Sequence, residues 1–500
     1  MSYFYAALPI LLVLALMLFF KRGSHQAGFA GWLAGIVIAV LAFGLNWQVF
    51  WVSQVKGLLL SLNVLWVLWP ALVLYHLVDQ AGGIRAIAAA LQEMIPDHGW
   101  LLVVQAWMLT ALVENLSGFG LPIAIVSPLL IAMGVSPVAA VAASAVGHSW
   151  AVSMGGMALA FRTMMDIVGM TTREVFPTAA IFLGVTVLLT GLAVALVLRQ
   201  LRYWKRILVL SLAVALTQYL VGLSGAIPLS SFSAAIVGIL GGYLLGRIGE
   251  KERGRVTQTP QLKGGLISYG FLFLSVIVVI VIRPLNEWLA QVRLTHLFPE
   301  VITSTGRVTA EGPGFIFKPF THPGTLIILT VMFAALILPR ITGSKSAGVK
   351  TALKSAFHSA LPASLGTLFM IGLSTLMEHT GMTQLIAQGL SLAFGSVYPL
   401  VSPLVGALGA FATGSNTNSN ILFGPMQKGV ADLLKISAIT LLATQTTGGS
   451  IGSMIAPAKL AVGGSTNSMK GKEGEVLRIT LPVALLCVLV VGLIAFLFVR

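Results

Sequence analysis

The stretch FATGSNTNSNILFG, Phe411 to Gly424, holds three Asn, two Thr, two Ser and two Gly within fourteen residues. The sequence on both sides of it is mostly Leu, Val, Ala and Ile, as in membrane-spanning helices. Irregular backbone at membrane depth is tolerated only where protein or a water-filled cavity surrounds it. The stretch therefore predicts the tip of a re-entrant hairpin or an unwound helix inside a membrane protein.

The composition of the whole chain agrees with a membrane protein. Its 500 residues are 57% hydrophobic and 9% charged, and the mean hydropathy is +0.96. Apolar runs long enough to cross a bilayer predict roughly 12 transmembrane helices. We therefore expect an all-α polytopic protein embedded in the lipid bilayer of the cell inner (plasma) membrane. Examples of such runs are Phe4–Phe20, Leu58–Val78, Ile181–Leu198, Leu266–Ile282, Leu326–Leu338 and Ile479–Val499.

The net charge of +15 comes from short basic clusters between the apolar runs. This is the pattern by which positively charged loops mark the cytoplasmic side, so the charge predicts topology and no nucleic-acid partner. With every cluster in the cytoplasm, both termini lie outside and Arg283–Pro323 becomes an external loop. The clusters are Lys21/Arg22, Arg199–Arg206, Arg247–Lys263, Arg340–Lys354 and Lys470–Arg478.

Two pairs of segments indicate an internal repeat. Val78–Leu91 resembles Met377–Leu390 at an offset of 299 residues, and Val135–Ala160 resembles Ile436–Ala461 at an offset of 301. With the basic clusters in the cytoplasm, the loop after Val78 is cytoplasmic and the loop after Met377 is external. This opposite placement predicts two inverted repeats, an architecture common in secondary transporters. The predicted division is 1–56 for N-terminal membrane helices, 57–200 for repeat 1, 201–323 for connecting helices and the external loop, and 324–500 for repeat 2 with the C-terminal helix.

Each repeat contains a polar break at the same place. In repeat 1 it is ENLSGFGLP (Glu114–Pro122), and in repeat 2 it is Thr413–Asn420; further polar layers follow at Gly147–Gly156 and Thr444–Ser453. Such breaks expose backbone N–H groups at the start of a half-helix, which together with Asn, Ser and Thr donors suit a carboxylate. The alternative is that these small residues only allow helices to pack closely. Close packing requires small residues on one face of a helix, whereas here they form an unbroken run. The substrate-binding candidates are Asn115, Ser117, Gly118, Gly120, His148, Ser149, Ser415, Asn416, Thr417, Asn418, Ser419, Asn420, Gln445, Thr446 and Thr447.

Glu114 is the only acid between Asp97 and Asp166. Because an isolated acid at membrane depth is costly, we interpret Glu114 as a proton-coupling residue, with His148 as a second candidate. The alternatives are that Glu114 holds its loop through backbone amides and that His148 is a packed donor to a neighbouring helix.

Lys459 lies in the segment IAPAKLAVGG, with Lys470 and Lys472 soon after it. These neighbours favour a lysine that reaches to the membrane interface over one that pairs with substrate. The sequence has no HExxH, no clustered His and Cys ligands and no phosphate-binding glycine loop, so we expect no enzyme, no metal site and no cofactor.

Taken together, these motifs resemble the lactate permease family, which takes up L-lactate and related 2-hydroxy monocarboxylates such as glycolate with protons. The resemblance covers nearly the whole chain, and its most specific parts are ENLSGFGLPIAI (Glu114–Ile125), TGSNTNSNILFG (Thr413–Gly424), TTGGSIGSMIAP (Thr446–Pro457) and HPGT (His322–Thr325). It implies an L-lactate or glycolate symporter with protons as the coupling ion. The chain departs from the family pattern at Asn416 (usually Asp), Ser453 (usually Lys), Glu378 (usually Asn) and Asn115 and Leu116 (usually small residues).

The sequence thus predicts a secondary active transporter, a proton symporter of a small organic anion such as L-lactate. Two alternatives remain open at this point. A Na⁺-coupled carrier of a dicarboxylate or sulfonate would use carbonyl groups at the breaks, and a passive anion channel would use the same polar lining.

Overall fold

Helices make up almost all of the secondary structure in the computed structural model, which describes residues 2–20, 22–116, 121–248, 257–343, 348–466 and 472–499. Within these ranges eleven helices are long and apolar enough to cross a membrane, and the bent pair Pro137–Ala151 and Gly155–Val168 brings the number to twelve if it counts as one span. The prediction of an all-α membrane protein with roughly 12 crossings is therefore confirmed.

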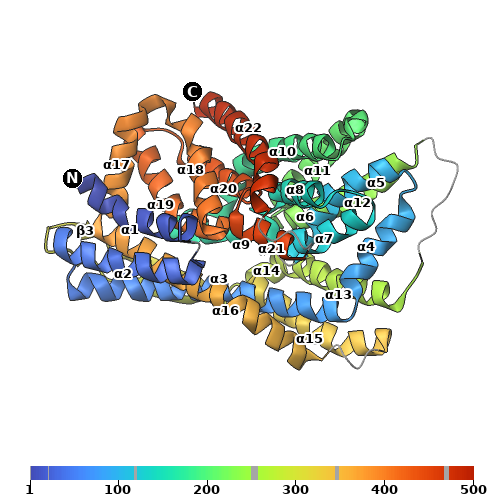
Figure 1. Cartoon of the computed structure of the whole chain (residues 1–500). Coiled ribbons are helices and arrows are strands. Elements are labelled where there is room, and N and C mark those ends of the chain that lie inside the picture. Colours follow the sequence, from blue (N-terminus) through green and yellow to red (C-terminus); the bar gives the residue numbers. More distant parts are fainter. Residues whose placement is uncertain are drawn as a thin grey trace.

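Two long helices, α3 (Trp47–Gln80) and α16 (Val349–Thr380), form the axis of a first group of helices in the lower part of Figure 1. Lys56, early in α3, pairs with Glu378, late in α16, at 3.8 Å. Further along, Trp69 donates to Ser364 Oγ at 3.0 Å, so the two helices run antiparallel. The other helices of this group are α1 (Ser2–Leu18), α2 (Ser24–Ala42), α4 (Gly83–Met94), α13 (Pro260–Val276), η5 (Ile277–Val281), α14 (Arg283–Leu289) and α15 (Pro323–Thr342). Helix α17 (Met382–Phe394) lies at the upper left of Figure 1 and packs on α19.

A second group of helices packs above α3 and α16 in Figure 1 and contains the largest fully buried side chains, among them Trp100, Trp107 and Trp150. The break between α18 and α19 lies in this group. Its members are α5 (His98–Val104), η1 (Gln105–Leu109), α6 (Thr110–Leu116), α7 (Leu121–Ala132), α8 (Pro137–His148), η2 (Ser149–Ala151), α9 (Gly155–Val168), α10 (Thr172–Val197), η3 (Leu201–Tyr203), α11 (Trp204–Leu223), η4 (Ile227–Leu229), α12 (Ser230–Gly246), η6 (Gly395–Val397), α18 (Tyr398–Thr413), α19 (Asn416–Leu434), α20 (Ala438–Gly452), α21 (Pro457–Thr466) and α22 (Glu473–Val499).

Two stretches of the chain begin in the same way. The set of elements from α3 to α10 and the set from α16 to α22 each start with a long helix, and Gly82 (φ 80°) and Gly381 (φ 82°) make the turn after it. Glycine suits both turns because other residues are strained at positive φ. The last helix of each set packs against the other set, since α10 contacts α20 and α22 contacts α8. The inverted relation of the sets and the division at 57–200 and 324–500 stay predictions.

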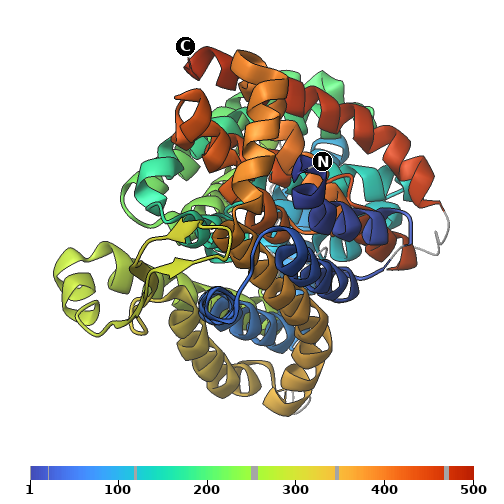
Figure 2. The same ribbon diagram turned by 90° about the vertical axis from the view of Figure 1, so that its left-hand side faces the viewer.

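The hydrophilic stretch Arg283–Pro323 is more ordered than the loop expected for it. After α14, strands β1 (Leu294–Phe298) and β4 (Gly312–Phe317) pair antiparallel, and β2 (Val301–Ile302) pairs with β3 (Val308–Thr309). β2 and β4 contact α3, beside which the strands lie in Figure 2. The sequence did not predict these strands, because they are short and the first four residues of β1 are all exposed, so no alternation marks them.

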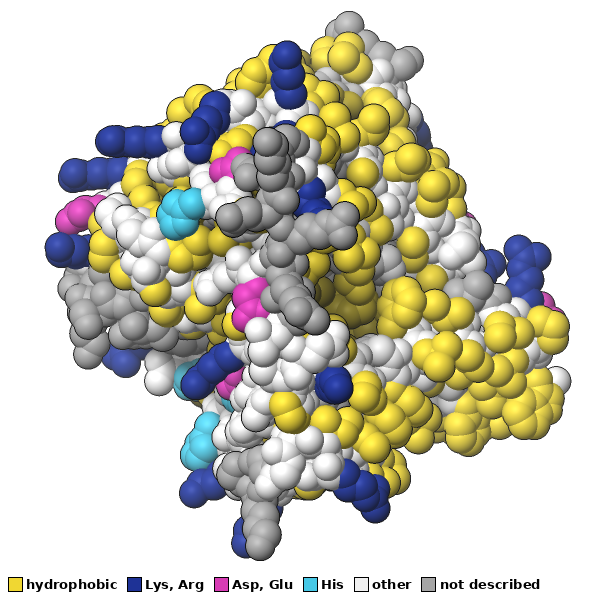
Figure 3. Space-filling model, turned by 90° about the vertical axis from the view of Figure 1, so that its right-hand side faces the viewer, with side chains coloured by type: hydrophobic (Ala, Val, Ile, Leu, Met, Phe, Trp, Pro, Cys, Tyr) yellow, Lys and Arg dark blue, Asp and Glu magenta, His cyan; other side chains and the backbone are white. Residues whose placement is uncertain are grey.

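The surface also fits a membrane protein. Large hydrophobic side chains are exposed on outer helices such as α2, α11 and α22. Figure 3 shows hydrophobic side chains over one flank of the face it presents, while Lys and Arg side chains project at the edges. A bilayer would cover such an apolar flank, because exposed apolar area of this extent is unfavourable in water.

The antiparallel packing of α3 and α16 gives a test of the predicted topology. We expect a cysteine at Arg85, an exposed position just after α3, to be labelled from the cytoplasm, and a cysteine at Gln384, just after α16, to be labelled from outside. The measurement is labelling of intact and opened cells with a charged maleimide, after replacement of Cys487, the single cysteine. Labelling of both positions from one side would refute the inverted repeat.

Candidate functional site

The break in repeat 2 is a narrow turn between α18 and α19. Helix α18 ends at Thr413, Gly414 adopts φ 68°, and the Ser415 side chain caps α19 by accepting a hydrogen bond from the Asn418 backbone N–H at 3.3 Å. Residues from Asn416 onward are helical, so the irregular backbone is shorter than the predicted Thr413–Asn420. The N-terminus of α19, which carries the positive end of the helix dipole, is buried, since Asn416 is 2% exposed and Asn418 is 5% exposed.

Two of the asparagines of α19 hold the helix in place. Asn416 Nδ2 donates to Ser153 Oγ at 2.9 Å, and Asn420 Nδ2 donates to Thr446 Oγ1 at 3.0 Å and to the Ala160 carbonyl at 3.0 Å. Thr446 Oγ1 in turn donates to Ser153 Oγ at 3.0 Å. These bonds join α19 to α9, to α20 and to the turn after η2, so they fix the position of the break.

A second polar layer lies one turn further along α19. Gln445 Nε2 donates to Ser419 Oγ at 3.1 Å, and Gln427 Nε2 donates to Gln445 Oε1 at 3.0 Å. Thr447 is fully buried, and its Oγ1 has no hydrogen-bond partner in the described part of the chain. Ser419 and Gln445 therefore connect α19 to α20 rather than facing a cavity.

The break in repeat 1 brings Glu114 to the same region. Glu114 lies in the last turn of α6 with 4% of its surface exposed, and its Oε2 has no hydrogen-bond partner among the described residues. Asn115 instead donates to Ser231 Oγ on α12 at 3.2 Å. The candidates Ser117, Gly118 and Gly120 lie outside the described residues.

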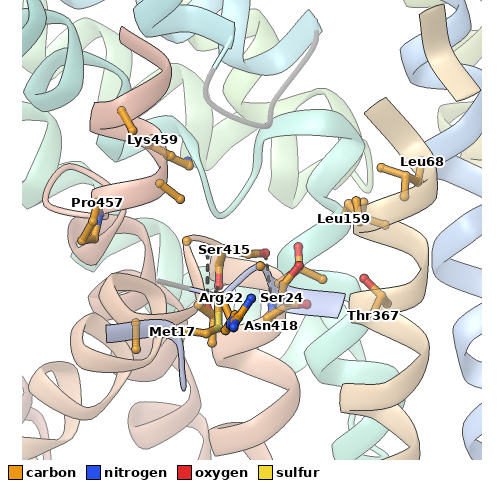
Figure 4. A pocket seen from close by; sticks show the side chains of 18 of the residues that line it. Met17, Arg22, Ser24, Leu68, Leu159, Thr367, Ser415, Asn418, Pro457 and Lys459 are labelled. Carbon is orange, nitrogen blue, oxygen red and sulfur yellow. Dashed lines mark hydrogen bonds between the residues drawn. The ribbon is translucent and has the colours of Figure 1, made fainter. Parts of the chain in front are cut away.

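Two adjoining cavities meet at the start of α19. The inner cavity has a volume of about 80 Å³, and its walls include Glu114, Asn416, Thr417 and Lys459. The outer cavity, of about 740 Å³, is shown in Figure 4 and includes Asn418. The two cavities adjoin, since they share wall residues: Leu68, Leu159, Gly414, Ser415, Thr417 and Lys459.

Lys459 belongs to this site, and the interpretation that it reaches to the interface is wrong. Only 6% of its surface is exposed. Its ammonium donates to Ser453 Oγ at 2.5 Å and lies 3.5 Å from His148 Nε2. The opposite ring nitrogen, Nδ1, lies 3.0 Å from the Ser144 carbonyl. The fully buried His148 thus contacts the lysine, whereas Ser149 Oγ donates to the Val146 carbonyl at 2.8 Å.

The predicted residues therefore divide into two sets by position. Glu114 and Ser415 to Asn418 line the two cavities, whereas the other described candidates line neither of them. Within the first set, Asn416 donates its Nδ2 to Ser153 Oγ, whereas Asn418 is 5% exposed and its Oδ1 has no partner within the described ranges. Its amide is thus available to a solute in the outer cavity.

Comparison with known proteins identifies a family. The family model described as L-lactate permease matches residues 2–500. The glycolate permease GlcA of Escherichia coli (strain K12) is 25% identical, with 98% of this chain and 94% of the relative covered. The L-lactate permease of Streptococcus iniae is 26% identical, with 89% of this chain and 94% of the relative covered.

Two solved structures resemble this chain weakly. The YdaH transporter of Alcanivorax borkumensis matches with a TM-score of 0.46 at 16% identity, over 88% of this chain and 85% of that one. MtrF of Neisseria gonorrhoeae matches with a TM-score of 0.48 at 16% identity, over 89% of this chain and 82% of that one.

Proposed function

The chain belongs to the L-lactate permease family, and on that premise we propose that this transporter of small organic acids carries a 2-hydroxy monocarboxylate, L-lactate or glycolate, together with a proton. The observation that carries the proposal is that a buried acid and a buried lysine line one small cavity at the N-terminus of α19. We place the protein in the plasma membrane with both termini outside.

The inner cavity suits the carboxylate end of such a substrate. The first N–H groups of α19 carry the positive end of the helix dipole, and the side chains of Ser415, Asn416 and Thr417 surround them. Lys459 adds a full positive charge on the same wall. Hydroxyl and amide groups can also bond the 2-hydroxyl group of the substrate.

The volume of the inner cavity favours a short acid. Its 80 Å³ is several times the ~10–15 Å³ that one water molecule requires. The cavity therefore fits a solute of a few non-hydrogen atoms such as lactate, and Leu68 and Leu159 give it an apolar side for the methyl group.

Glu114 supplies the proton-coupling group. A carboxylate that lines the same cavity as the substrate carboxylate repels it when both are ionised. Protonation of Glu114 removes this repulsion, so proton and anion should each favour binding of the other.

The test is uptake of labelled acids into proteoliposomes. We expect an inward pH gradient, applied without Na⁺, to drive L-lactate or glycolate above its external concentration, with saturable counterflow. Uptake that requires Na⁺ would support the sodium-coupled alternative, and non-saturable flux without counterflow would support a channel. No uptake of any 2-hydroxy monocarboxylate would refute the proposal.

Asn418 and Asn420 should behave differently although they are two residues apart. We expect Asn418→Ala to weaken substrate binding by about tenfold with little change in stability, because the side chain faces the outer cavity. Asn420→Ala should lower stability by about 1–3 kcal/mol as well, because its two buried bonds are lost. Thermal unfolding with increasing lactate measures both, and unchanged substrate stabilisation in both variants would contradict the expectation.

A further inference from the structure

We infer that Lys459 binds the substrate carboxylate and neutralises Glu114 in the empty carrier, so that one proton accompanies each anion and transport moves no net charge. The inference rests on the proposed function, and it adds the binding group, the stoichiometry and the response to membrane potential.

The contacts of Lys459 leave its charge free to pair with an anion. The ammonium is held by two neutral groups, Ser453 Oγ and His148 Nε2. In the described part of the chain no carboxylate oxygen lies within 4.0 Å of it. A buried ammonium without a carboxylate partner is unfavourable, which makes it a strong attractor for an anion in the adjoining cavity.

His148 acts as a positioning residue for this ammonium. Because Nδ1 lies 3.0 Å from the Ser144 carbonyl, that nitrogen carries the hydrogen and donates it. Nε2 then presents its lone pair, toward which Lys459 points at 3.5 Å. The imidazole in this arrangement is neutral, and it orients the lysine without adding a charge to the site.

Glu114 is the negative group that shares the cavity with Lys459. Both residues line the inner cavity, so their opposite charges attract each other across a short distance in a region of low polarity. Glu114 Oε2 has no hydrogen-bond partner among the described residues, so the carboxylate is not committed to another contact.

Other charged groups described on the elements packed against α6 and α21 do not form ion pairs with Glu114 or Lys459. Arg162 and Asp166 of α9 act on each other, and Glu473 faces the outer cavity. The titratable and charged groups on these elements are His148 on α8, Arg162 and Asp166 on α9, Tyr243 on α12, and Glu473, Glu475, Arg478 and Cys487 on α22.

The charge of the cavity then follows from its contents. The empty cavity is neutral when Glu114 is ionised, because the charges of Lys459 and Glu114 cancel. The cavity with one anion and a protonated Glu114 is also neutral, because the charges of Lys459 and the anion cancel. An anion without a proton leaves one negative charge, and a proton without an anion leaves one positive charge. Because an unpaired buried charge costs several kcal/mol, only the two neutral states should cross the membrane readily, which requires one proton for each anion.

The first test replaces the lysine in the full-length protein. We expect Lys459→Gln to lower lactate counterflow and lactate binding by about 10- to 100-fold. Lys459→Arg, which keeps the charge, should recover a measurable part of both. Lys428→Gln is the matched control, because Lys428 is a partly exposed lysine on α19 paired with Asp432, and it should behave like the unmodified protein. Unchanged counterflow in Lys459→Gln would overturn the inference.

The second test uses the unmodified protein, so it does not depend on folding of a variant. We expect a potassium diffusion potential, set with valinomycin at a constant pH gradient, to leave the initial rate of lactate uptake unchanged, and a pH dye to report one proton per lactate. A severalfold faster rate with a negative interior would show that net positive charge moves and would overturn the inference while leaving proton-coupled transport intact. Absence of proton-driven uptake in the same liposomes would instead count against the proposed function.

Discussion

Glu114→Gln is expected to abolish uphill uptake of lactate while exchange of bound lactate across the membrane continues. Glutamine imitates the protonated carboxyl group, so the loaded cavity holds Lys459 and the anion and remains neutral. In the empty carrier Lys459 has no partner of opposite charge. The empty carrier should therefore return slowly to the outward-facing state, because an unpaired buried charge costs several kcal/mol. We expect net uptake to fall by more than about 100-fold and counterflow to stay within about tenfold of the unmodified protein.

The pH dependence of binding should change in the same variant. In the unmodified protein, a protonated Glu114 favours the anion, so affinity for lactate should rise as the pH falls. In Glu114→Gln the affinity should stay near that higher level at all pH values, because no proton remains to be taken up. Uptake driven by a pH gradient and counterflow in the same liposomes measure the two activities.

A matched control comes from a second acid outside the site. Glu475 is an exposed acid on α22 that lines neither cavity, so Glu475→Gln should keep both uphill uptake and counterflow. If Glu114→Gln still accumulates lactate with an unchanged pH profile, Glu114 is a structural acid. His148 would then become the next candidate for proton coupling.

Much of the fold follows from the sequence because the bilayer limits the choices. Apolar runs in a membrane must be helices, so their number and the place of the polar breaks could be predicted. The exact extent of the break at Gly414 could not, because small polar residues occur both in irregular backbone and in the first turn of a helix.

Which polar side chains line the cavities depends on the residue at which helix α19 begins. The sequence alone does not determine that residue. Asn416 and Asn420 are four residues apart and so lie on one face of α19, where they bond to neighbouring helices. Asn418 lies between them on another face and lines the outer cavity. Once the helix is known to begin at Asn416, this division follows from its 3.6-residue period.

Lys459 was misinterpreted for a different reason. Its neighbours Lys470 and Lys472 pointed to a nearby membrane boundary, but the contacts that define its environment come from His148, 311 positions earlier. The resemblance to lactate permeases implied a missing lysine at Ser453. The structure places the ammonium of Lys459 2.5 Å from Ser453 Oγ, so this chain brings a cation to that place from another position.

Two very close helix crossings give a large expected effect on folding. Gly147 of α8 and Gly448 of α20 are equivalent in the predicted repeat, and a Cβ atom at either would overlap a backbone carbonyl, that of Ala106 or of Pro403. We expect Gly147→Ala and Gly448→Ala each to cost at least the ~1–3 kcal/mol typical of overpacking, because backbone cannot move aside as a side chain can.

Gly270 provides the matched control for this pair. It is a glycine inside α13, and no described atom from outside its own helical turn lies within 4 Å of the place that a Cβ atom would take. Gly270→Ala should therefore be neutral or stabilising by up to ~1 kcal/mol. Thermal unfolding in detergent compares the three variants, with size-exclusion chromatography to detect misfolded protein. Similar losses at positions 147 and 448, far apart in the sequence, would show that the same close crossing is needed in both sets of helices. Tolerance of alanine at either position would mean that the two crossings are not equivalent and would weaken the case for a duplicated unit.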